Sequence, residues 1–75
     1  MTLSQFNELN ELQQYNTVWD KGILIDARFT SKYKFVLYQV DTFYVEIKYD
    51  GEKNEILGLK SFTAVMPLLE YRSVN

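Results

Sequence analysis

The clearest pattern of hydrophobic and polar positions lies in residues 33–50, which are rich in Val, Ile, Tyr and Phe. These residue types favour the pleated, half-buried surface of a β-sheet. The polar pair Asp41-Thr42 divides the stretch into two runs of strand length, which predicts a β-hairpin. The second run alternates between apolar and polar residues, as a strand with one buried face does. The first run holds four consecutive apolar residues, Phe35 to Tyr38, so we expect apolar neighbours on both of its faces.

The pattern on either side of this hairpin predicts two helices and two more strands. Apolar residues at a spacing of three predict a helix from Thr2 to about Asn16, begun by a capping box of Thr2 and Gln5. Alternation over residues 23–30 predicts a strand, and the polar stretch 50–55 predicts a turn before a short strand at residues 56–60. Ser61 or Thr63 can cap a last helix, with Pro67 near its first turn, that runs to about Arg72.

These elements predict one small α+β domain over residues 1–75. It has an N-terminal helix, a four-stranded antiparallel β-meander in the order 1-2-3-4, and a short C-terminal helix. Two-residue turns at Ser31-Lys32 and Asp41-Thr42 set the register, and directly opposed residues share a face of the sheet. The predicted core face consists of Ile25, Ala27, Phe29, Val36, Tyr38, Val40, Val45 and Ile47.

The opposite face then carries apolar residues within a border of charges, which is typical of an interaction surface. Its predicted contact residues are Phe35, Leu37, Tyr44 and Leu57, bordered by Arg28, Glu46 and Lys48. We favour both helices on the core face, because an antiparallel sheet needs cover on one side only. Two alternatives stay open: the helices cover opposite faces, or a bulge shifts the first arm of the hairpin and exchanges its faces.

Composition narrows the possible chemistry. The chain has no cysteine and no histidine, so it lacks thiol ligands, the commonest general base and the commonest transition-metal ligand. No serine lies in a recognisable nucleophile motif, and the three glycines form no phosphate-binding loop. We therefore expect no enzyme activity, catalytic residue, metal, cofactor or small-molecule substrate. The polar turn at residues 50–55 lacks the spacing of a calcium loop.

The net charge and the hydropathy of the chain indicate which partners and which cellular location to expect. Eight Lys and Arg stand against ten Asp and Glu, a net charge of −2, which disfavours nucleic acid as a partner. No apolar run is long enough to cross a membrane, and no signal peptide is apparent, so we expect a cytoplasmic protein. No motif is specific enough to indicate a family.

The sequence therefore predicts a non-enzymatic protein-interaction module that pairs through its sheet face or an edge strand, with itself as a homodimer or with another protein. One alternative is a small acidic inhibitor or regulator, of the immunity type, that masks a basic partner. A second alternative is single-stranded nucleic-acid binding on the aromatic residues of the sheet.

Overall fold

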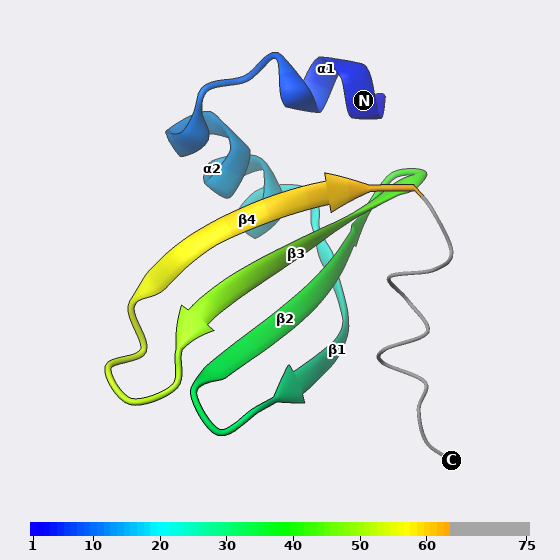
Figure 1. The fold of residues 1–75 in the computed structure, drawn as a ribbon. Helices are drawn as coiled ribbons and strands as arrows, with labels where there is room; N and C mark the ends of the chain where they lie inside the picture. The colour runs from blue at the N-terminus through cyan, green and yellow to red at the C-terminus, as the bar shows by residue number, and fades with distance from the viewer. Residues whose placement is uncertain (64–75) are drawn as a thin grey trace.

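A computed structural model describes residues 1–63, which form two short helices and one four-stranded sheet (Figure 1). The elements are α1 (Leu3–Asn7), α2 (Glu11–Lys21), β1 (Ile23–Phe29), β2 (Tyr33–Val40), β3 (Phe43–Asp50) and β4 (Ile56–Phe62). All neighbouring strands are antiparallel and follow the order β1-β2-β3-β4. The α+β class and the meander are thus confirmed. Ser61 belongs to β4 and caps no helix, and the predicted helix around Pro67 lies outside the described residues.

The predicted N-terminal helical segment is confirmed, but it forms two helices, so the prediction of a single helix ending near Asn16 was wrong. The capping box at the start of α1 is confirmed: the Gln5 amide donates to the Thr2 hydroxyl at 3.1 Å, and the Thr2 amide donates to Gln5 Oε1 at 2.9 Å. Asn10 and Gln13 form a second capping box of the same kind. Asparagine side chains bond nearby backbone amides and so favour helix starts over helix interiors. The second box therefore starts a new helix, which continues to Lys21.

The register of the central hairpin agrees with the prediction. Val40 lies opposite Phe43, Tyr38 opposite Val45 and Val36 opposite Ile47. The turn is made possible by Asp41, whose φ of 53° is left-handed, a conformation that aspartate tolerates better than most residues.

The register of β1 agrees with the prediction over only part of its length. Phe29 lies opposite Lys34 and Ala27 opposite Val36, as expected. A β-bulge between Leu24 and Asp26 then shifts the pairing, so Leu24, and not Ile25, lies opposite Tyr38. A bulge adds one residue to one strand and bends it locally.

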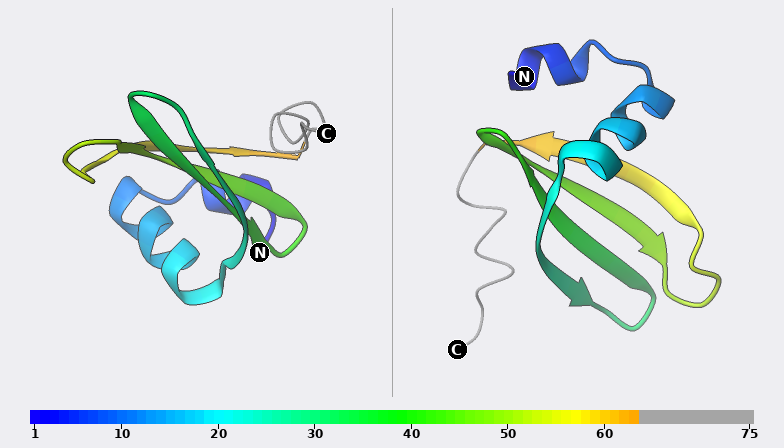
Figure 2. Two further views of the ribbon diagram at one scale, coloured as in Figure 1. Left: turned by 90° about the horizontal axis from the view of Figure 1, so that it is seen from below. Right: turned by 180° about the vertical axis from the view of Figure 1, so that it is seen from behind.

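Both helices cover the same face of the sheet (Figure 2). α1 packs mainly on β4 and α2 on β2. The buried core between the layers consists of Phe6, Val18, Val40, Phe43, Val45 and Ile47. Its centre is the ring pair of Phe6 and Phe43, whose centroids are 5.3 Å apart. The core therefore lies toward the end of the sheet that carries the Asp41-Thr42 turn.

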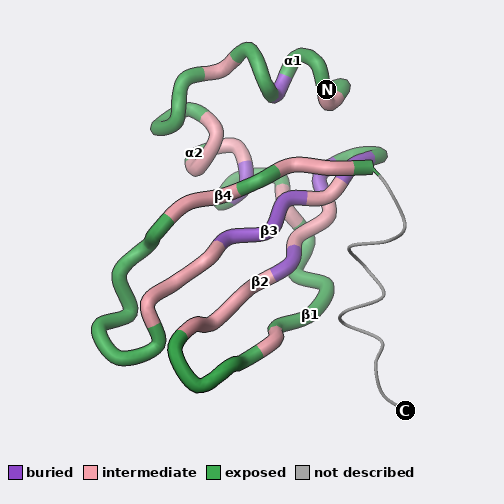
Figure 3. Tube along the Cα trace, viewed as in Figure 1, coloured by how far each residue is buried: buried purple, intermediate pink, exposed green. Residues whose placement is uncertain are grey.

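The predicted core residues of β1 are not in the core. Phe29 is 72% exposed, Ile25 is 46% exposed and Ala27 is also exposed. Figure 3 shows exposed positions along almost all of β1, whereas β2 and β3 contain only buried and half-buried positions. Within the described residues, the helices pack mainly on β2 and β4, and they make no comparable contact with β1.

Candidate interaction surfaces

Most of the predicted contact residues lie together on the sheet face opposite the helices, here called the outer face. Arg28, Phe35 and Lys48 are direct cross-strand neighbours on β1, β2 and β3. Leu37 and Glu46 form the next row on β2 and β3. The strand pairing thus assembles five of the seven predicted residues into one patch.

Within this patch the cations lie on aromatic rings and around one carboxylate. The Arg28 guanidinium is 4.2 Å from the centroid of the Phe35 ring, and Lys48 Nζ is 4.1 Å from that of Tyr33. Arg28 Nη2 and Lys60 Nζ each lie 3.7 Å from an oxygen of Glu46. Burial lowers the local dielectric and strengthens such charge pairing. The charged groups of the outer face therefore contact aromatic rings and a carboxylate of the same face.

Burial limits what the outer face offers to a partner. Leu37 is 1% exposed and Glu46 is 4% exposed, so neither side chain is accessible in this structure. A shallow cavity of about 300 Å³ lies nearby. It is lined by Phe35, Glu46, Lys48, Gly58, Leu59 and Lys60.

Of the other two predicted contact residues, Tyr44 lies in the next row of the same face, opposite Gln39, and Leu57 lies apart from the patch. Tyr44 stacks on Phe62, with ring centroids 6.0 Å apart, farther along the strands. Leu57 lies at an irregularity in the pairing of β4, on an edge of the sheet, and is 50% exposed. Because Leu37 is buried and Leu57 lies at the edge of the sheet, the outer face exposes less apolar area than the sequence predicted.

A more exposed apolar surface lies along β1. We call the β1 surface the group of Trp19, Ile23, Leu24, Ile25 and Phe29, each of which is between 46% and 72% exposed. Trp19, near the end of α2, packs on Tyr38, and Leu24 is the cross-strand neighbour of Tyr38. The group therefore begins at the end of α2 and continues along the strand. From these fractions the five residues together expose on the order of 600 Å², spread over the end of α2 and both faces of β1.

The backbone of β1 is less available for pairing with another strand than the exposure of its side chains suggests. β1 pairs only with β2, so its other edge faces away from the sheet. The Ala27 amide donates to Oδ1 of Asp26 at 2.7 Å, and the bulge lies just before these residues. Bulges and inward-bonded polar groups are means by which edge strands avoid pairing with other chains. The edge strand thus exposes apolar side chains, but its Ala27 amide is not available to hydrogen-bond another strand.

Sequence reasoning missed the β1 surface, because alternation in β1 indicates a strand but not which face is covered. One signal was present: three consecutive apolar residues, Ile23 to Ile25, follow Trp19 closely, and a half-covered strand does not need such a run.

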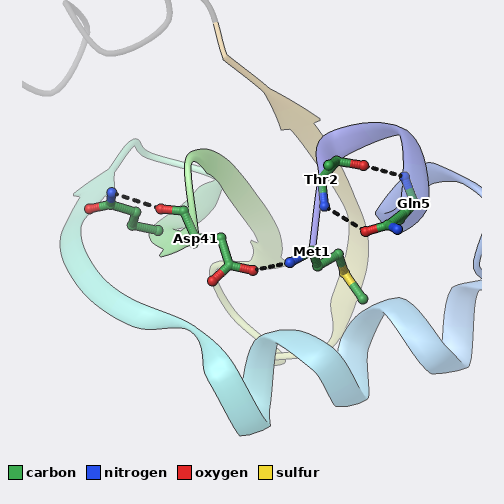
Figure 4. A network of polar contacts seen from close by, with 5 residues as sticks. Met1, Thr2, Gln5 and Asp41 are labelled. Atoms are coloured by element: carbon green, nitrogen blue, oxygen red, sulfur yellow. Dashed lines mark hydrogen bonds and ion pairs between the residues drawn. The ribbon is translucent and has the colours of Figure 1, made fainter.

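A polar contact fixes the N-terminal helices to the sheet (Figure 4). The Met1 ammonium group donates to Oδ2 of Asp41 at 2.7 Å, across 40 residues of sequence. This hydrogen bond and the positive charge lower the pKa of the Asp41 carboxyl. Gln39 also donates to the Asp41 carbonyl at 3.1 Å. The contact joins α1 to the central hairpin beside the core.

Comparisons with known proteins give no identification: no protein-family model, curated protein or solved structure matches this chain. Within residues 1–63, no helix is long and apolar enough to cross a membrane. Over the same residues, acidic side chains nowhere gather in groups of three or more that could hold a metal ion.

Proposed function

We propose that this protein is a non-enzymatic, cytoplasmic protein-interaction module that binds through the β1 surface. The observation that carries this proposal is the exposure of an apolar edge strand: six of the seven residues of β1 are exposed. Exposed apolar patches of this size mark protein-interaction sites, because leaving them in water forgoes the free energy of burial. The sheet edge is therefore the contact region, and the outer face is a border.

The anatomy of the β1 surface supports this reading. Interfaces combine an apolar centre, enriched in Trp and Phe, with a polar rim. Trp19 and Phe29 supply large aromatic side chains at the two ends of the surface. Asp26 and Arg28 lie between these two residues in the sequence, on the same strand as Phe29, and supply polar groups. Both the composition and the arrangement fit a protein partner.

Photo-crosslinking tests the proposal directly. Benzoylphenylalanine placed at position 29 should crosslink to a protein, either a second copy or another protein, in a lysate of the cells that express it. The same group at position 57 is the matched control, because Leu57 is also exposed and lies on the opposite edge strand. Products from position 29 and none from position 57 are expected. Equal products, or none from either position, would contradict the proposal.

A second candidate is an acidic regulator that masks a basic partner, and the charge of the helical layer favours it. Residues 1–21 carry Glu8, Glu11 and Asp20 against the single Lys21. Charge of this kind accelerates association with a basic protein, and the acceleration decreases steeply with salt. Binding that survives high salt and depends on Phe29 favours the β1 surface. Binding that is lost in salt and is indifferent to Phe29 favours the acidic regulator.

A further inference from the structure

We infer that the outer face is covered by residues 64–75 of the same chain, which follow the described part of the structure. The cover lies over Leu37 and Glu46, two residues of the predicted contact surface on β2 and β3. This inference concerns a different surface from the proposed function and does not depend on it. It names the occupant of the face on which the sequence predicted an external partner.

The burial of Leu37 requires a cover. Leu37 lies on the outer face between Asp26 of β1 and Glu46 of β3, and it is only 1% exposed. Cross-strand neighbours surround the sides of a side chain, but its tip stays in contact with water unless another layer lies on it. Asp26, in the same row, is itself exposed. Among residues 1–63 both helices lie on the other face of the sheet (Figure 2), so they do not supply this layer.

The cover comes from within the chain. Glu46, opposite Leu37 on β3, is only 4% exposed and therefore lies under the same cover. Both side chains are buried within a single chain, so neither a second copy nor another protein is needed to cover them. The sheet, its turns and the two helices on the other face account for residues 1–63. The part of the chain that remains is residues 64–75.

The chain leaves β4 close to the buried pair. β4 ends at Phe62, whose ring stacks on that of Tyr44 on the outer face. Tyr44 precedes Glu46 by two positions on β3, which is about 7 Å along a strand. A segment with the length of residues 64–75 spans roughly 18 Å even when it is helical, so it reaches Leu37 and Glu46.

The composition of the segment fits the surface that it covers. It contains the apolar side chains Val65, Met66, Leu68 and Leu69. An apolar cover over Leu37 removes apolar surface from water on both sides of the contact. The shallow cavity of about 300 Å³ beside Glu46 gives room for one of these side chains. Its lining includes Gly58, where a Cβ atom would meet nothing within 4 Å beyond the neighbours of Gly58 in the chain.

Thiol reactivity in the full chain tests the inference, because the sequence has no cysteine and an engineered thiol is the only one present. Leu37→Cys should react with a water-soluble disulfide reagent at least roughly tenfold more slowly than Leu57→Cys, whose side chain is 50% exposed. Adding Leu68→Glu and Leu69→Glu should raise the rate at Leu37→Cys by a similar factor, because charged side chains leave an apolar contact. Val45→Cys, on the helix-covered face, should stay protected with and without the two glutamates.

Three results would overturn the inference. A Leu37→Cys thiol that reacts as fast as the Leu57→Cys thiol would show that the outer face is open. An unchanged rate at Leu37→Cys in the presence of both glutamates, with Val45→Cys still protected, would assign the cover to another part of the chain. Protection of Leu37→Cys that disappears on dilution would assign it to a second copy.

A second measurement decides the question if the two glutamates unfold the chain, which loss of protection at Val45→Cys would report. Nuclear Overhauser spectra of the wild-type chain should show contacts between the methyl groups of Leu37 and those of Leu68 or Leu69. Contacts between the rings of Phe6 and Phe43 are the control for an intact core. Core contacts without contacts from Leu37 to the segment would contradict the inference. Crosslinking from position 29 tests the proposed function separately.

Discussion

β1 and β3 have similar patterns of apolar and polar residues but opposite burial. Both contain apolar residues spaced by polar ones, and both carry acidic and basic side chains. In β3 the residues Phe43, Val45, Glu46 and Ile47 are buried, whereas β1 has no buried residue. The difference comes from neighbours: β3 lies between two strands and under the helical layer, whereas β1 has one neighbouring strand and no comparable helix contact among residues 1–63. Periodicity thus specifies a strand, and tertiary cover specifies its burial.

The largest expected effect is a difference in stability between two phenylalanines. Phe43→Ala removes a fully buried ring that packs on Phe6, and we expect it to lower the free energy of unfolding by about 3–5 kcal/mol. Phe29→Ala removes a mostly exposed ring, and we expect a change within about 0.5 kcal/mol. Urea denaturation of each variant, at a protein concentration where only the monomer is present, measures both. Similar losses would show that β1 is covered in solution.

A smaller effect is expected at the buried carboxylate of β3. Glu46→Gln keeps the shape of the side chain but removes the negative charge near Arg28 and Lys60. We expect a loss of about 1–3 kcal/mol, because a buried charged contact is costly to leave incomplete. The control is Glu52→Gln in the exposed turn between β3 and β4, which should be nearly neutral. A neutral Glu46→Gln in urea denaturation would mean that the charges on the outer face contribute nothing to the fold.

The smallest expected effect on stability concerns the ion pair between Met1 and Asp41, which lies on the covered side of the comparison, beside the turn that joins β2 to β3. The pKa of Asp41 is lowered in the folded state by the Met1 ammonium group, whereas an unfolded aspartate titrates near about 3.9. The contact therefore stabilises the fold above that pH, and its contribution is lost as the pH decreases through the lowered pKa. Asp41→Asn retains a residue that tolerates the left-handed φ.

The measurement for Asp41 is the urea midpoint of the wild-type chain and of Asp41→Asn as a function of pH. The two midpoints should differ at neutral pH and converge in strong acid. Acetylation of the α-amino group should reproduce the neutral-pH difference in the wild-type chain and have no further effect in Asp41→Asn. A difference that is constant with pH would exclude the ion pair as its cause.

Much of the fold could be predicted because its signals are local. The four strands, their order and the register around Asp41-Thr42 follow from alternation and from the length of the turn. The capping box of Thr2 and Gln5 is a local signal as well. The second capping box, Asn10 with Gln13, was an equally local signal in the sequence. The apolar spacing that continues on both sides of it nevertheless favoured one long helix.

The candidate site was less predictable because it depends on packing. Which side chains share the outer face follows from register, so Phe35, Glu46 and Lys48 were placed correctly side by side. Exposure on that face does not follow from register, and Leu37 is buried where the sequence suggested an open contact. The bulge in β1 and the reach of the helices decide the position of the exposed apolar area, and both depend on contacts distant in sequence.

The hydrogen bond from the Ala27 amide to Asp26 also bears on how concentrated this protein can become. Ile23, Leu24 and Ile25 form a short apolar run of high β-propensity directly before that amide. Such a run beside an open strand edge is a template for fibres that grow without limit. We therefore expect the Asp26 carboxylate, which occupies the Ala27 amide, to disfavour the open-ended stacking of strands on this edge.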